Sequence, residues 1–201
     1  MNKIYNNKKG VFFTFVAIFF IVLIISVVST QSKFRYREKS NAIQTRINTM
    51  NTFVMDFEKD VSRELFIGGY RSLISLNAYI RDIETYIEDM DLVFTEILIN
   101  GTANNTQMAL MTQDGFGADV TNWLVRVNEE AEKLNIIVNI IVNDVTLTHI
   151  TPWDVRVGLN LSINFGDVTN LVSWNFEKVY FQDFSILGFE DPMYLVETND
   201  K

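Results

Sequence analysis

The chain of 201 residues contains no cysteine and one histidine, and these scarcities exclude several kinds of chemistry. Without cysteine there is no disulfide bond, no thiolate nucleophile and no cysteine-ligated zinc site. The single imidazole, His149, has no second histidine with which to share a metal, and catalysis would need partner residues. The sequence also lacks a Gly-x-Ser-x-Gly elbow and a Walker phosphate loop. We therefore expect a protein that is not an enzyme and has no cofactor.

Positive charge is scarce as well. The chain has 17 lysines and arginines against 25 acidic residues, which gives a net charge of −8. Nucleic-acid binding needs clustered cations that neutralise phosphates, so this balance argues against a nucleic-acid partner. One acidic stretch, from Asp82 to Asp91, matches no calcium-loop spacing. It is more typical of a solvated helix face, and we expect no metal site.

One apolar run stands out against this acidic background. Val11–Val28 contains 18 residues, of which only Thr14 and Ser26 are polar. As a helix it would be about 27 Å long, close to the thickness of a bilayer's hydrocarbon core. No small-residue cleavage triplet follows Val28, so a retained membrane anchor is favoured over a conventional secretory signal.

The orientation of this span is less clearly marked. Basic residues flank it on both sides: Lys3, Lys8 and Lys9 before it, then Lys33, Arg35, Arg37 and Lys39 after it. The positive-inside rule is therefore close to a tie. Three Asn-x-Ser/Thr sequons, at Asn100, Asn104 and Asn160, favour an extracytoplasmic C-terminal part and are candidate glycosylation sites.

Beyond the apolar run, helical periodicity continues. Apolar residues recur every three or four positions from Ile43 to Leu65, and no glycine or proline lies between Val28 and Phe66. This pattern predicts one long helix. Its apolar face could cover the core of its own domain, which we favour after about Ile43, or pack in a coiled coil or filament. The pair Gly68-Gly69 then indicates a kink, a turn or close helix packing.

The middle of the chain is also expected to be helical. A second run of apolar residues with three- and four-residue spacing extends from Leu73 to Ile97, and a polar loop is expected at Asn100–Thr106. After a break at Gln113–Asp119, a short amphipathic helix is predicted. Its expected apolar face consists of Val120, Leu124, Val127, Ala131 and Leu134.

After Asn135 the periodicity changes from helix to strand. Residues 154–166 alternate apolar and polar side chains, which is typical of an antiparallel strand with one wet face. Residues 136–150 and 171–189 predict further strands, and Gly166-Asp167 is a plausible tight connection. Helices followed by strands indicate an α+β fold, in which a long N-terminal helix and further helices precede an antiparallel sheet or sandwich.

The residues directly before the apolar run resemble a known signal. Lys8-Lys9-Gly10 followed by Val11 is similar to the class III signal peptide of archaeal type IV pilin-like proteins. The resemblance implies that a prepilin-type peptidase cuts between Gly10 and Val11 on the cytoplasmic side, and that the apolar helix is kept. Bacterial pilins have glutamate at the fifth mature position, whereas this chain has Phe15. The departure favours the archaeal relatives, in which that glutamate is not general.

Two further segments resemble archaeal pilin-like surface proteins of uncharacterised function. They are the helical stretch Asp56–Ile80 and the C-terminal stretch from Trp153, which ends in a Gly-x-x-Asp-Pro-x-Tyr segment. The similarity covers most of the chain and implies a membrane-anchored extracytoplasmic protein. Because the family is defined by its architecture, the resemblance supplies no catalytic residue.

Together these patterns predict four regions. They are a cytoplasmic leader at 1–10, a transmembrane helix at 11–30, a helical region at 31–135 and an antiparallel β region at 136–201. The favoured function is a pilin-like structural subunit of the cell surface, with the membrane, other copies in an oligomer or filament, and a prepilin-type peptidase as partners. The alternative is an anchored extracytoplasmic sensor or ligand-binding module that never polymerises. Processing at Gly10, and whether the first helix contacts protein or lipid, discriminate the two.

Overall fold

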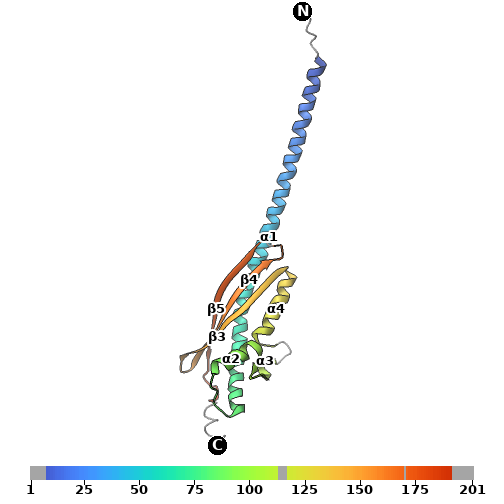
Figure 1. Ribbon diagram of the computed structural model, residues 1–201. Coiled ribbons are helices and arrows are strands. Elements are labelled where there is room, and N and C mark those ends of the chain that lie inside the picture. The colour runs from blue at the N-terminus through green and yellow to red at the C-terminus, as the bar shows by residue number, and fades with distance from the viewer. Residues whose placement is uncertain (1–7, 113–116, 170, 192–201) are drawn as a thin grey trace, which may run out of the picture. The chain divides into compact units, whose positions relative to one another are not determined.

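The computed structural model describes residues 8–112, 117–169 and 171–191. In these residues the chain forms helices first and an antiparallel sheet last, which confirms the predicted α+β fold. The elements are α1 (Lys8–Ile83), α2 (Met90–Asn100), β1 (Thr102–Ala103), β2 (Thr106–Gln107), α3 (Ala109–Thr112), α4 (Val120–Lys133), β3 (Ile136–Thr151), β4 (Asp154–Asp167) and β5 (Ser173–Ser185) (Figure 1).

Helix α1 belongs to two compact units. The first unit is Met1–Asn48 and the second is Thr49–Lys201, so the division falls inside the helix. In the first unit α1 is the only described element, and it packs on no core of its own. The second unit, which we call the head, contains all the other elements. The prediction of one uninterrupted helix between Val28 and Phe66 is confirmed.

In the head, α1 is amphipathic and forms one wall of the core. Its buried apolar side chains recur at intervals of three, four, seven or eight residues: Met50, Phe57, Val61, Leu65, Leu73, Leu76 and Ile80. Since a helix has about 3.6 residues per turn, this spacing places them along one side. From Met50 onward the helix therefore covers its own domain's core, as the sequence favoured.

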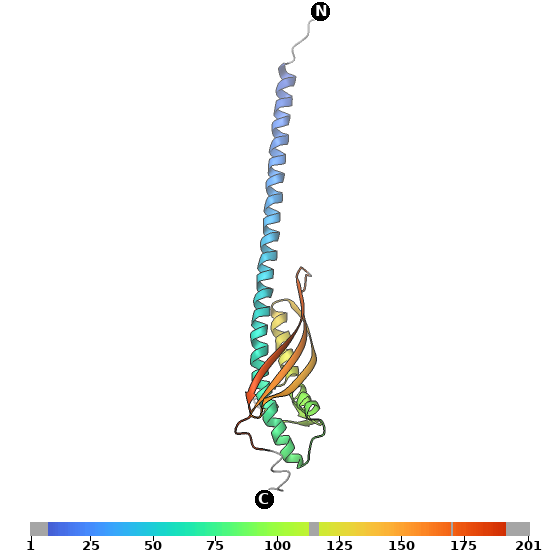
Figure 2. The same ribbon diagram turned by 90° about the vertical axis from the view of Figure 1, so that its left-hand side faces the viewer.

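The sheet supplies the opposite wall. Its strand order is β3-β4-β5, with both pairs antiparallel. Alternate residues of the central strand face inward and are almost fully buried: Val155, Val157, Leu159, Leu161, Ile163 and Phe165. This is the face that the alternation predicted. Helix α4 and the head part of α1 lie against it (Figures 1 and 2).

Aromatic rings join the three elements where they meet. The ring of Phe165 on β4 lies edge-on to Phe57 of α1, with centroids 5.1 Å apart, and Phe57 stacks on Trp123 of α4 at 5.6 Å. Such pairs contribute about 0.5–1.5 kcal/mol each beyond the area they bury. They fix how α4 is seated on α1 and the sheet.

The paired glycines mark close packing, and neither a kink nor a turn occurs there. Helix α1 continues through Gly68 and Gly69 without interruption. A Cβ atom on Gly68 would lie 2.8 Å from the carbonyl oxygen of Ala118, and one on Gly69 would lie 2.9 Å from the ring of Phe184. The glycines thus let the segment before α4 and strand β5 approach the helix backbone.

Three local expectations were wrong. The periodic run from Leu73 to Ile97 is divided between α1 and α2, because the chain leaves the helix at Glu84, where φ is 51°. Asp89 then starts α2 by accepting a hydrogen bond from the backbone N–H of Leu92 at 3.0 Å. The helical spacing of apolar residues continues across this break, and no glycine or proline marks it in the sequence.

The second difference concerns the expected turns. Gly166-Asp167 belongs to β4, and the connection to β5 is closed by a hydrogen bond from the backbone N–H of Asp167 to Val172. The expected loop at Asn100–Thr106 is a small hairpin of β1 and β2. Its two turn residues, Asn104 and Asn105, both have positive φ, a conformation that asparagine tolerates.

The third difference is the buried face of α4. Val120, Val127 and Ala131 are buried as expected, but Leu134 is 39% exposed and Trp123 is 2% exposed. The helix is therefore turned so that its largest side chain enters the core.

The glycine packing yields a stability prediction. Gly68→Val should lower the free energy of unfolding of the head by at least about 2 kcal/mol, because the new side chain must displace backbone next to Ala118. Thermal unfolding of the full chain in detergent, followed by tryptophan fluorescence, measures the change. Gly166→Val is the matched control, since a Cβ there meets nothing within 4 Å. Equal unfolding temperatures for the two variants would show that the Gly68 contact does not constrain the packing.

Candidate functional site

The candidate processing segment lies at the described start of α1. Lys8, Lys9 and Gly10 are helical, whereas the side chains of Lys8–Val11 lie outside the described residues. The backbone on both sides of the expected cut, at Gly10 and Val11, is therefore helical.

The segment that follows is apolar and exposed. We call Phe12–Val28 the apolar segment. Among the described residues, α1 is the one helix long and apolar enough to cross a membrane, and the most apolar part of it has no buried residue. The exposed large side chains of this segment range from 45% at Leu23 to 79% at Phe13, and Val16 is half-buried. A surface of this kind requires lipid or another protein chain as its cover.

The three sequons have different surroundings. Asn100 is the exposed last residue of α2. Asn104 lies exposed in the hairpin turn, where its Nδ2 donates to the hydroxyl of Tyr79 at 2.5 Å. Asn160 lies half-buried in the central strand, and its Nδ2 donates to Glu177 at 2.9 Å. A glycan could therefore be attached to Asn100 or Asn104 without opening the sheet.

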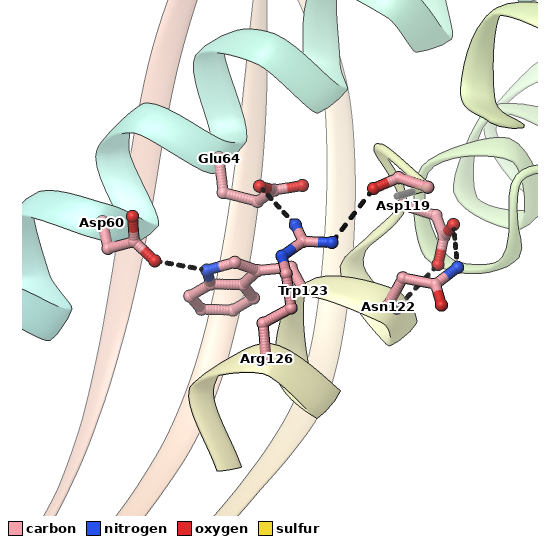
Figure 3. Close-up of polar contacts among 7 residues, drawn as sticks. Asp60, Glu64, Asp119, Asn122, Trp123 and Arg126 are labelled. Carbon is pink, nitrogen blue, oxygen red and sulfur yellow. Dashed lines mark hydrogen bonds and ion pairs between the residues drawn. The ribbon is translucent and has the colours of Figure 1, made fainter. Parts of the chain in front are cut away.

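A part-buried polar cluster, drawn in Figure 3, connects the head part of α1 to α4. The indole Nε1 of Trp123 donates to Asp60 Oδ2 at 2.8 Å. The guanidinium of Arg126 reaches Glu64 Oε2 at 3.4 Å, and it also donates to the carbonyl oxygen of Gly117 at 3.2 Å. The two carboxylates are one turn apart on α1, and they meet two side chains three positions apart on α4.

The start of α4 is held by a buried carboxylate. Asp119 is 2% exposed and precedes the helix in an extended conformation. Its Oδ1 accepts the backbone N–H of Asn122 at 2.8 Å, and its Oδ2 accepts the Asn122 amide at 2.7 Å. This cap places the first turn of α4 beside Glu64, so the two contacts support each other.

The electrostatics of Glu64 follow from its burial. The side chain is 12% exposed, and its Oε1 is buried without a hydrogen-bond partner among the described residues. Burial raises the pKa of Glu64 to about 7, although Arg126 acts in the opposite direction; Asp60 and Asp119 raise it further. At neutral pH the carboxyl group is therefore divided between its charged and neutral forms.

The described residues of the head line at least two hollows. One, of about 340 Å³, lies between α4 and β3 and is lined largely by Leu124, Val125, Val138 and Ile140. The other, of about 490 Å³, lies beside α1 near Phe189, where Asn77 Nδ2 donates to the carbonyl oxygen of Glu190 at 2.8 Å. The first hollow is mainly apolar, whereas the second is also lined by Arg81 and Glu190, which pair with each other at 3.6 Å.

The acidic stretch and the histidine do not form a site in the described part of the chain. Asp82 lies in the last turn of α1, while Glu84 and Glu88 lie in the connection before α2. His149 is exposed on the edge strand β3. Among residues 8–112, 117–169 and 171–191, no three His, Asp or Glu side chains converge to hold a metal ion.

Comparison of the chain with protein-family models, curated proteins and solved structures gives no match. Function is therefore inferred from the residues and the fold alone.

The cluster is the part of the head that sequence reasoning missed. Glu64 and Arg126 are 62 positions apart, and no local pattern connects them. A weak signal was present, because Glu64 lies between Val61 and Leu65, both of which belong to the buried stripe of α1. A carboxylate that borders a buried stripe has to meet a partner or lose its charge.

The raised pKa predicts a pH-dependent head. The folded-state pKa of Glu64 is about 7, and its value without burial is 4.5. The stabilisation of the head that depends on protonated Glu64 is therefore fully present below about pH 4.5 and is lost as pH rises through 7. The free energy of unfolding should fall by at most about 2 kcal/mol between pH 5.5 and 8.5. Urea unfolding at several pH values, followed by the fluorescence of buried Trp123, measures this slope.

Two variants separate Glu64 from the other carboxylates. Glu64→Gln should flatten the slope in this window and stabilise the head at the alkaline end. Glu130→Gln removes an exposed carboxylate paired with Lys133 and should leave the slope unchanged. A wild-type slope that persists in Glu64→Gln would contradict the assignment.

Proposed function

We propose that the protein is a pilin-like structural subunit of the cell surface, processed after Gly10 and anchored or assembled through its N-terminal apolar helix. The observation that carries the proposal is the contrast within α1. Its head part buries an apolar stripe from Met50 to Ile80, whereas the apolar segment Phe12–Val28 is uncovered. One helix thus provides both the wall of the head and a surface for an external partner.

The chemistry of the apolar segment supports two successive partners. A helix satisfies its backbone hydrogen bonds internally, so this segment can lie in lipid at no polar cost. Transfer from lipid to a bundle of identical helices gains little hydrophobic energy, because acyl chains are as apolar as leucine side chains. Association in such a bundle depends on van der Waals packing, for which the segment offers many branched and aromatic side chains.

Cleavage of the leader would remove a barrier to moving the apolar helix from the membrane into a filament. The leader 1–10 contains Lys3, Lys8 and Lys9, whose charges resist movement through the bilayer. Cleavage between Gly10 and Val11 would remove all three. The mature chain would then begin with the apolar segment itself, as the resemblance to archaeal pilin-like proteins implies.

The head has the role of a soluble outer domain in this proposal. Its core is closed by α1, α4 and the sheet, and its outer sheet face carries polar side chains paired across strands. Arg156, for example, contacts both carboxylate oxygens of Asp183 at 2.6 and 2.8 Å. These polar pairs favour a solvated head when the apolar segment is in lipid or in a filament, although Ile141 and Phe181 are also exposed on this face.

The N-terminal residue of the protein in native membranes tests the proposal. Intact-mass spectrometry should find a mature chain that begins at Val11. Gly10→Val should retain the leader, because the peptidase would lose its glycine, while Asn6→Ala should be processed normally. If the mature chain begins at Met1 or Asn2, an anchored module that never polymerises becomes the better account.

Filament isolation from the same cells then distinguishes a subunit that assembles into filaments from a processed pilin relative that stays in the membrane. Sheared surface fractions should contain the processed chain and lack the Gly10→Val variant. Processed protein found solely in the membrane fraction would support a pilin relative that does not polymerise.

A further inference from the structure

The charges of the chain are divided sharply between the two units. Residues 11–48, the part of the first unit that remains after cleavage at Gly10, contain five basic residues and one acidic residue. Residues 49–201 contain nine basic and 24 acidic residues. The corresponding net charges are +4 and −15. An asymmetry of this size indicates a partner for the basic part that is itself anionic.

Four of the five basic residues lie close together, just after the apolar segment. They are Lys33, Arg35, Arg37 and Lys39, and with the aromatic residues Phe34 and Tyr36 between them they form what we call the juxtamembrane belt. All six side chains are exposed, Phe34 by 61% and Tyr36 by 74%. The one acidic residue of this part, Glu38, cannot balance four cations.

The helix distributes the belt around its circumference. Residues four positions apart lie on one side of an α-helix, so Lys33 and Arg37 share one side while Arg35 and Lys39 share another. Like charges at this spacing repel one another unless an external anion is present. A partner that surrounds the helix satisfies both pairs, whereas a single protein surface would contact one side.

The distance from the apolar segment places the belt at a membrane surface. Lys33 is five residues beyond Val28, a rise of about 7 Å along a helix, which is close to the depth of a headgroup layer. Side chains of a helix lean toward its N-terminus, so those of the belt lean back toward the apolar segment. Long basic side chains extend further in that direction, and aromatic residues favour this same layer.

We propose that the juxtamembrane belt binds the phosphate groups of anionic phospholipids in the leaflet on the C-terminal side of the span. This inference rests on the membrane anchoring in the proposed function and adds a lipid preference to it. The belt fixes the depth of the helix in the bilayer. The acidic head is repelled by the same anionic surface that attracts the belt.

Lipid retention by the full chain tests this inference. The protein is reconstituted in nanodiscs with equal amounts of zwitterionic phosphatidylcholine and anionic phosphatidylglycerol, and the lipids that stay bound are identified by native mass spectrometry. The wild type should enrich phosphatidylglycerol by about fivefold, which is the effect of one basic residue at an anionic surface. The preference should weaken at about 1 M salt because screening shortens the range of these interactions.

A charge-matched pair of variants isolates the belt. K33Q/R35Q/R37Q/K39Q should lose the enrichment. K59Q/R63Q/R81Q/K133Q removes four exposed cations from the head and should keep it. Equal enrichment in both variants, or none in the wild type, overturns the inference. A belt variant that keeps the lipid preference but loses its oligomers also overturns it, because the belt would then contact acidic groups of a second copy.

Carbonate extraction distinguishes this failure from failure of the proposed function. Wild type and both variants should remain in the membrane pellet, since the apolar segment is unchanged in all three. Retention of the protein in the pellet without enrichment of phosphatidylglycerol would contradict the belt proposal and leave the membrane anchor standing. Release of the wild type into the soluble fraction contradicts the anchor itself.

Discussion

The packing of one helix face against one sheet face is the constraint on which the head depends. The buried stripe of α1 and the inward residues of β4 form two walls, and α4 closes the space between them through Trp123. Because α1 supplies a wall of this core, its orientation in the head is fixed. The same helix is continuous with the apolar segment, so whatever binds that segment is connected to the head through unbroken helix.

The polar cluster at this contact adds specificity at some cost in stability. A carboxylate removed from water loses solvation, and the ion pair between Glu64 and Arg126, at 3.4 Å, recovers part of it. The raised pKa of Glu64 shows that burial outweighs the nearby cation. The hydrogen bond from Trp123 to Asp60 and the cap at Asp119 specify one seating of α4 among those that apolar packing alone would allow.

Much of the fold could be predicted because its pattern is local. The spacing from Ile43 to Leu65 indicated α1, and the alternation from Val155 to Phe165 identified the inner face of β4. The break at Glu84 could not be predicted, because a helical spacing that continues by coincidence conceals it. The contact of Glu64 with Arg126 joins residues distant in sequence, so it required tertiary structure. Conversely, the expectation of processing at Gly10 rests on the sequence alone, and the described structure adds only the helical backbone there.

We propose that the apolar segment packs against other copies of itself, and the absence of cysteine from the sequence makes this packing directly measurable. Single cysteines at Phe19, Phe20, Ile21 and Val22 sample all sides of the helix, since consecutive residues are about 100° apart. Oxidation of native membranes and filaments should give cross-linked dimers from at least one position, whereas Val125→Cys on the head serves as the control. Monomers at all four positions, with the thiols accessible to a lipid-soluble reagent, would mean that lipid alone covers the segment and would contradict the account.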